Sequence, residues 1–138
     1  MNIAKAAKTT NVNAQWYVQR KIPFIGSNIW GEILCEPIRY QLGLTEHEQS
    51  VLRANDQRPP LLYVVYSYGE YFPMYIYDYL TNSWYGNSDK YSRSTTEHQD
   101  QCRPTYDNNA ITWMDTEDMK WVVYRRSITG IIRAPSAA

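Results

Sequence analysis

The sequence predicts a single α+β domain, in which a small antiparallel sheet of three to five strands carries three or four short helices packed mainly on one face. Three observations support this prediction. Two neighbouring runs, 61–68 and 73–80, are rich in β-branched and aromatic residues, as strands are. Helix-start signals follow them at Ser94 and Asp115. The chain has 138 residues, which suffices for one hydrophobic core but not for two typical domains.

Composition sets the expected limits of this domain. Residues 1–13 are small and polar and are interpreted as a flexible N-terminal tail. The domain is expected to span 14–133, followed by a short C-terminal tail over 134–138.

The hydrophobic pattern assigns the first half of the domain to one strand followed by helices. Residues 15–22 have strand character, because bulky aromatic and β-branched residues follow one another there. Between 28 and 44 the apolar residues recur at helical spacing, and Pro37 either kinks this helix or begins a second one. A Thr45-x-x-Glu48 capping box then predicts a short helix over 46–54.

The second half of the domain begins with the two strong strand signals, which a turn at Gly69-Glu70 separates. A Ser94-x-x-Glu97 capping box and an acidic first turn at 115–118 each open a helix. The elements expected there are strands over 61–68, 73–80, 84–85 and 111–114, helices over 94–102 and 116–126, and a last strand within 127–133.

Tyrosine and tryptophan are unusually frequent, with thirteen and five copies against two phenylalanines. Such rings combine apolar area with one polar group and are common at protein interfaces. In strand 73–80 the side chains alternate, which places Met74 and Ile76 on one side and tyrosines on the other. The tyrosine side is interpreted as a wet surface, a partner site or a second packed layer. The residues expected to bind a partner are Tyr66, Tyr68, Tyr75, Tyr77, Tyr79 and Trp84.

A second group of residues brings cations and hydroxyls to the start of the helix expected over 94–102. Free backbone N–H groups at such a position can hold a phosphate or a carboxylate. The alternative is a capped helix with solvated charges, because Asp89 and Glu97 partly cancel the positive field. The residues of this candidate anion site are Lys90, Ser92, Arg93, Thr95, Thr96 and His98.

Several of these residues occur in a characteristic order between 61 and 104, namely Ser67-Tyr68, Trp84, Asn87, Lys90-Tyr91-Ser92 and Thr95-Thr96 followed by His98. The order resembles a motif of small proteins from bacteriophages and mobile elements that contain a domain of unknown function. The spacing departs from that motif in two places, since Ser94 precedes the threonine pair and only Glu97 separates it from the histidine. The resemblance implies a phage-like origin, and hence the host cytoplasm or the virion, but no chemistry.

Charge and hydropathy narrow the function classes. The chain has 14 basic and 14 acidic residues, and this balance disfavours a general nucleic-acid binder. No run of about 18 apolar residues occurs, so no membrane span is expected. Cys35 and Cys102 lack the spacing of a zinc site. They are expected to be reduced thiols of a cytosolic protein, and the alternative is a single disulfide between them.

Catalytic patterns are weak. His98 and Cys102 share one helix face, whereas Cys–His enzymes draw these groups from separate elements and add a third residue. His47 lies between two glutamates on one short helix, without further metal ligands nearby in the sequence. Neither a phosphate-binding glycine loop nor G-x-S-x-G is present. We therefore expect no catalytic residue, metal or cofactor.

The sequence predicts a non-enzymatic accessory protein of a phage or mobile element that binds a protein partner through its tyrosine-rich surface. An inhibitor of a host defence complex, in the manner of an anti-CRISPR protein, and a minor virion component both fit this description. The alternative is a binder of nucleotides or other anionic small molecules that acts as a signal sponge. Nucleic acid is a less favoured partner, and an oligomer is compatible with either function.

Overall fold

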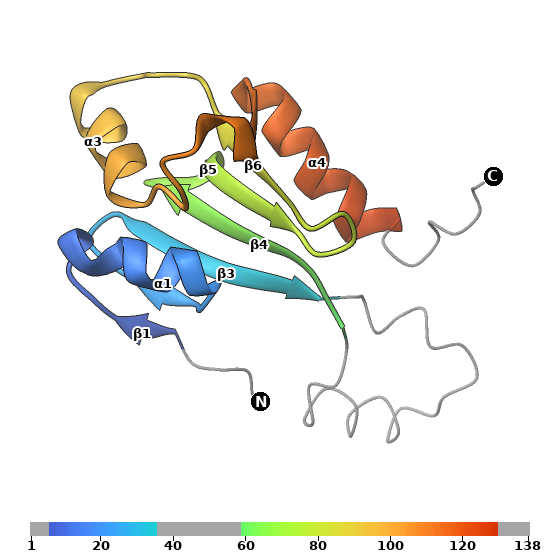
Figure 1. Ribbon diagram of the computed structural model, residues 1–138, viewed down its shortest axis with the longest axis horizontal. Coiled ribbons are helices and arrows are strands. Elements are labelled where there is room, and N and C mark those ends of the chain that lie inside the picture. The colour runs from blue at the N-terminus through green and yellow to red at the C-terminus, as the bar shows by residue number, and fades with distance from the viewer. Residues whose placement is uncertain (1–5, 36–58, 130–138) are drawn as a thin grey trace.

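The computed structural model describes residues 6–35 and 59–129, which form one mixed β-sheet with helices on both faces (Figure 1). The strands are β1 (Ala7–Lys8), β2 (Phe24–Ile25), β3 (Ile29–Cys35), β4 (Pro60–Ser67), β5 (Gly69–Asp78), β6 (Ser83–Asn87) and β7 (Ile111–Met114). The helices are α1 (Ala14–Arg20), α3 (Arg93–Gln101) and α4 (Thr116–Thr129), with single 3₁₀ turns η1 (Asn11–Asn13) and η3 (Asn108–Ala110).

The predicted sheet was too small and of the wrong kind. The sheet in the structure has seven strands in the order β1 to β7, so each strand pairs with its neighbours in sequence. The pairs β1–β2 and β6–β7 are parallel, and the four pairs between them are antiparallel. Parallel neighbours need a crossover connection, and α1 and α3 lie in those two connections. Residues 6–13, placed in a tail by their composition, contribute β1 and η1.

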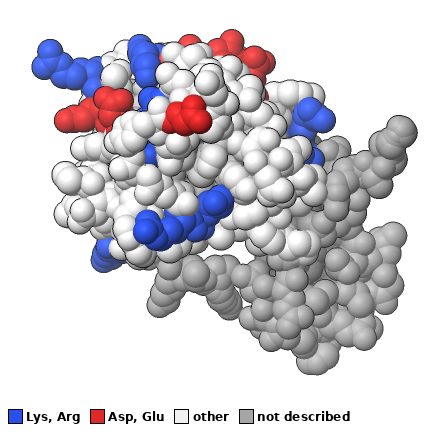
Figure 2. Space-filling view, viewed as in Figure 1, with Lys and Arg blue, Asp and Glu red and all other residues white. Residues whose placement is uncertain are grey.

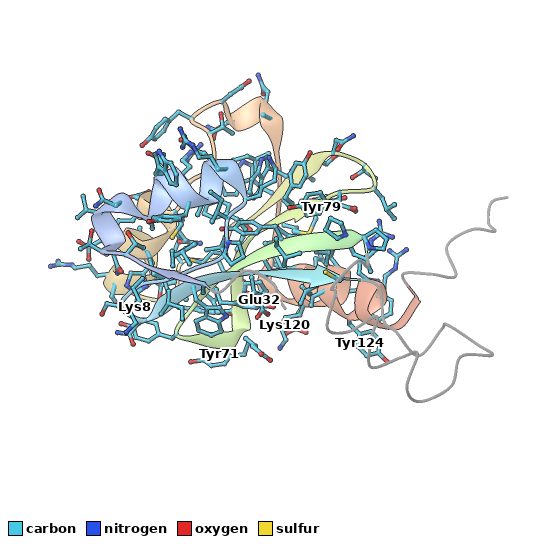
Figure 3. The ribbon with its side chains drawn as sticks, turned by 90° about the horizontal axis from the view of Figure 1, so that it is seen from below. Lys8, Glu32, Tyr71, Tyr79, Lys120 and Tyr124 are labelled. Carbon is cyan, nitrogen blue, oxygen red and sulfur yellow. The ribbon has the colours of Figure 1, made fainter. Side chains whose placement is uncertain are left out.

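The helices cover both faces of the sheet rather than mainly one. Buried residues of α1 and the residue after α3, Cys102, pack with one face, whereas Met119 of α4 packs with the other. Figure 3 shows α1 and α4 on opposite sides of the strands. The central strand β4 is buried from Leu61 to Ser67 as a result. A strand covered on both faces has a continuous apolar run, and L-L-Y-V-V-Y is such a run.

Two sequence assignments in the first half were wrong. Residues 14–20 form a helix because Ala14 and Val18, one turn apart, are both fully buried, and Lys21 ends the helix in a left-handed conformation. Residues 29–35 form a strand whose side chains alternate between the two cores. The rest of the expected 28–44 helix and the 46–54 helix lie outside the described residues.

The other assignments in the second half agree with the structure within a few residues. The α4 helix continues to Thr129, through the start of the strand expected within 127–133. None of the helices in the two described ranges has both the length and the apolar character to cross a membrane.

Candidate functional site: an aromatic cleft at the tip of β4 and β5

Most of the predicted partner-binding rings form a packed layer instead of an outward-facing row. Tyr66 and Tyr75 are only 3% and 2% exposed, too little for either ring to stand in an outward-facing row. Tyr77, Tyr79 and Trp84 are half-buried against the core on the α1 side. Their neighbouring rings meet edge to face, with centroids 5.0 and 5.2 Å from that of Tyr77. Of the six residues, only Tyr68 is exposed, at 49%.

A bulge in β5 explains part of this difference. Val65 pairs with Tyr75 and Tyr66 pairs with Pro73, which leaves Met74 without a partner on β4. A bulge disrupts the strict alternation of side chains, and Met74 and Tyr75 both pack in the core on the α1 side. Helices cover both faces of the sheet, so on the tyrosine side Tyr75 is buried and Tyr77 and Tyr79 are half-buried.

Three exposed tyrosines gather at a different place, where β4 turns into β5 beside the start of α3. Tyr68, Tyr71 and Tyr91 are 49%, 64% and 63% exposed and surround one cleft of about 330 Å³. We call it the hairpin cleft; its lining residues are Ser67, Tyr68, Tyr71, Phe72, Tyr91, Ser92, Ser94 and Thr95. Sequence reasoning missed Tyr71 and Tyr91, although the K-Y-S segment contained the second of them.

The rim of the hairpin cleft is held in place by local contacts. Tyr68 adopts a left-handed conformation, with φ of 67°, that closes the β4–β5 turn. Its amide donates to the carbonyl of Asn28 at 2.8 Å, and its hydroxyl donates to Ser94 Oγ at 3.1 Å. The rings of Phe72 and Tyr91 lie 4.9 Å apart. Two of the three exposed rings, Tyr68 and Tyr91, are therefore held by contacts within the chain.

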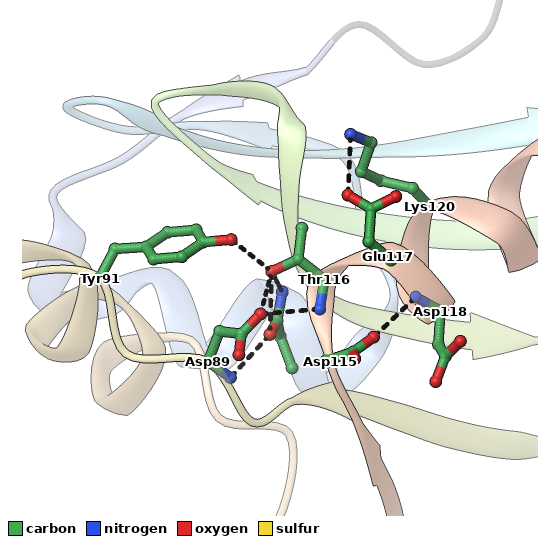
Figure 4. A network of polar contacts seen from close by, with 8 residues as sticks. Asp89, Tyr91, Asp115, Thr116, Glu117, Asp118 and Lys120 are labelled. Carbon is green, nitrogen blue, oxygen red and sulfur yellow. Dashed lines mark hydrogen bonds and ion pairs between the residues drawn. The ribbon is translucent and has the colours of Figure 1, made fainter.

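A polar network fixes the segment that carries Tyr91 (Figure 4). Asp89 accepts hydrogen bonds from the amide and the hydroxyl of Thr116, at 2.9 and 2.6 Å, and these bonds lower the pKa of its carboxyl. The hydroxyl of Tyr91 donates to Thr116 Oγ1 at 3.2 Å, and buried Asn87 donates to the same oxygen at 3.0 Å. The residues after β6 are thereby tied to the start of α4.

Behind the cleft, Ser67 and His98 form a buried pair. Ser67 Oγ and His98 Nδ1 lie 2.8 Å apart, and the Tyr68 ring covers the imidazole at 5.3 Å between centroids. Ser67 is fully buried and His98 is only 6% exposed, so the pair fastens α3 to β4 and does not offer a nucleophile to solvent. Burial also raises the pKa of Cys102 to about 12, which keeps this thiol protonated.

The candidate anion site is only partly assembled. Ser92, rather than Ser94, caps α3 and accepts a hydrogen bond from the amide of Thr95 at 3.1 Å. Thr95 and His98 are buried. Thr96 donates its hydroxyl proton back to the Ser92 carbonyl at 3.0 Å. The hydroxyls of Ser92 and Thr96 are therefore engaged in capping the start of α3.

The remaining residues of that site line a second cleft of about 450 Å³ next to the hairpin cleft. Lys90, Arg93 and Thr96 lie there with Glu97 and Asp100, so each cation has a carboxylate in the same cleft. Figure 2 shows both signs of charge mixed over α3 instead of a basic patch. The field at this helix start is therefore weaker than the sequence suggested.

The buried histidine predicts an acid-sensitive fold. Burial lowers the pKa of His98 below its usual 6.5, opposed by the charge of Glu97. The unfolded chain therefore binds the proton on His98 more readily than the folded chain does. The stability that neutral His98 contributes is fully present above pH 6.5 and is lost as the pH falls towards the lower pKa of the folded state. Urea unfolding between about pH 7 and about pH 5 should show this loss, and His98→Asn should reduce the slope. A His98 signal that titrates at or above 6.5 in NMR spectra would contradict this prediction.

No family model, curated protein or solved structure matches this chain.

Proposed function

We propose that this protein is a non-enzymatic binding protein whose hairpin cleft docks a protein partner. The observation that carries the proposal is the convergence of Tyr68, Tyr71 and Tyr91, each about half exposed or more, on one cleft. Rigid tyrosine rings lose little side-chain entropy on binding and cover much area. Their clustering in one concave place distinguishes them from exposed rings scattered singly, which are normal on protein surfaces.

The chemistry of the cleft favours a protein over a phosphate-bearing ligand. Its walls contain three exposed tyrosine rings and Phe72, and aromatic residues are enriched at protein interfaces. The adjacent cations share their cleft with Glu97 and Asp100, which weakens the case for a nucleotide or another anion. We further propose, on the motif resemblance alone, that this binder belongs to a phage or mobile element and acts on a host defence complex or in the virion.

Tyr71→Ala and Tyr91→Ala should each weaken capture of the partner at least tenfold, because truncating a central aromatic side chain commonly costs about 2 kcal/mol of binding. The measurement is affinity purification from cells that carry the parent genetic element, with bound proteins quantified by mass spectrometry. Gly69→Ala provides a second variant, because a Cβ there would overlap the Tyr71 ring and displace it without removing it.

Tyr106→Ala is the matched control, since this ring is 74% exposed but lies outside the cleft. It should leave capture unchanged. Thermal unfolding must show that each cleft variant remains folded. Equal capture by the native chain, Tyr71→Ala and Tyr91→Ala would refute the proposed site.

A further inference from the structure

The charged residues of this chain are unevenly distributed, although its net charge is zero. No acidic residue precedes Glu32, whereas Arg20 and Lys21 lie together at the end of α1. Figure 2 shows Lys and Arg side chains grouped over this end of α1, and in this view no Asp or Glu side chain adjoins them. The surface around the end of α1 is therefore locally positive, which the balance over the whole chain conceals.

Each of these two cations lies over an aromatic ring and keeps its charge unpaired. Arg20 Cζ lies 4.2 Å from the centre of the Trp16 ring, and Lys21 Nζ lies 4.4 Å from that of Tyr77. Within 6–35 and 59–129 neither cation forms an ion pair, and their side chains make a single hydrogen bond there, from Arg20 Nη1 to the Trp16 carbonyl at 3.0 Å. Arg20 is exposed, Trp16 is 50% exposed and Lys21 is half-buried, so all three are accessible to a ligand.

A third contact between a cation and an aromatic ring lies next to α1. Gln15 Nε2 donates to the carbonyl of Arg103 at 2.9 Å, which joins α1 to the loop after α3. Arg103 Cζ lies 5.8 Å from the centre of the Tyr106 ring, and this ring is 74% exposed. Asp107 is the only acidic residue of this loop, and its carboxylate accepts a hydrogen bond from the amide of Asn109 in η3. Cations and exposed rings therefore alternate from the end of α1 to this loop.

We propose that this surface binds single-stranded nucleic acid. We call it the α1 face; its residues are Trp16, Arg20, Lys21, Tyr77, Arg103 and Tyr106. Proteins that bind single strands combine cations along the phosphate backbone with aromatic side chains on which the bases stack, and bases also stack on guanidinium groups. An acidic protein segment would satisfy the charge but would bring no planar ring to Trp16. The inference does not depend on the hairpin cleft, which contains none of these residues.

The test measures fluorescence anisotropy of a labelled oligothymidylate of about 12 nucleotides with the intact chain, from about 50 mM salt upwards. Affinity should fall as salt rises, and Arg20→Gln should lower the slope of log K against log salt by about 0.7, the value for one phosphate contact of a single strand. Trp16→Ala should weaken binding about fivefold or more, because a stacked base loses its ring. An abasic strand of the same length keeps the phosphates and should bind more weakly by a similar factor.

Lys120→Gln is the matched control, because this exposed cation belongs to α4 on the opposite face of the sheet. It should leave the affinity and the salt slope unchanged. Thermal unfolding checks that each variant is folded; if Trp16→Ala is not, Arg20→Gln and the abasic strand still decide. No binding of the oligothymidylate, equal binding of the abasic strand, tighter binding of a duplex, or full affinity in Arg20→Gln would each overturn the proposal. So would equal affinity for a glutamate-rich peptide, since the surface would then fit an acidic protein.

Discussion

Replacing Tyr75 with alanine should lower the free energy of unfolding by about 4 kcal/mol, because it empties a large volume in a packed core. The residue is only 2% exposed, and its ring meets Trp113 edge to face at 6.3 Å. Its hydroxyl also donates to the carbonyl of Gln99 in α3 at 2.8 Å. Urea denaturation followed by tryptophan fluorescence would measure the loss. If Tyr75→Ala fails to bind a partner, the loss of binding would then result from unfolding and not from a missing contact.

Two further substitutions separate packing from hydrogen bonding. Tyr75→Phe keeps the ring and should cost only about 1 kcal/mol, the usual net value of one hydrogen bond. Tyr77→Ala should cost clearly less than Tyr75→Ala, because the Tyr77 side chain is half-buried and its hydroxyl reaches only the exposed turn residue Asn82. If Tyr75→Ala unfolds at the same urea concentration as the native chain, this ring does not support the core.

The elements that could be predicted from sequence are those whose signals are local. The run from Leu61 to Tyr66 marks a buried strand by composition alone, and hydroxyl and acidic residues mark the starts of α3 and α4. The helix assignment of residues 29–35 was wrong because their apolar residues fit helical spacing and strand alternation equally. Pairing with β4 decides in favour of the strand. The strand assignment of residues 15–22 was wrong because the tertiary packing of Ala14 and Val18 outweighs the strand propensity of the aromatic residues there.

The candidate site was only partly predictable, for a different reason. Which tyrosines are exposed depends on the bulge at Met74 and on α4, which covers the second face of the sheet. Neither feature has a local sequence signal that we recognised. The hydroxyls at the start of α3 were predicted to belong either to an anion site or to a capped helix, and the structure shows Ser92 as the cap beside the hairpin cleft. The tyrosine count therefore led to the prediction of a binding protein, but it could not identify which rings are exposed.

Replacing Asp78 with alanine should lower the free energy of unfolding by about 3 kcal/mol, because it leaves a partly buried cation without its partner. Arg126 Nη2 of α4 donates to Asp78 Oδ2 at 2.7 Å, and the two side chains are 20% and 3% exposed. The other oxygen of Asp78 accepts from the amide of Leu80 at 2.9 Å, so the carboxylate also shapes the β5–β6 turn. Urea denaturation measures the loss, and hydrogen exchange should show faster opening at the C-terminal end of α4.

A double-mutant cycle distinguishes the ion pair from the turn contact. Arg126→Met removes the cation, and the combined variant Asp78→Ala with Arg126→Met should be more stable than the sum of the two single losses predicts, by about 1 kcal/mol or more. The exposed pair Lys120–Glu117, with side chains 44% and 85% exposed, is the matched control. Glu117→Gln should change stability by less than about 0.5 kcal/mol, since solvent already screens that contact. Strict additivity at the first pair would mean that Asp78 stabilises the fold through its turn alone, and that α4 is held to the sheet by its apolar residues.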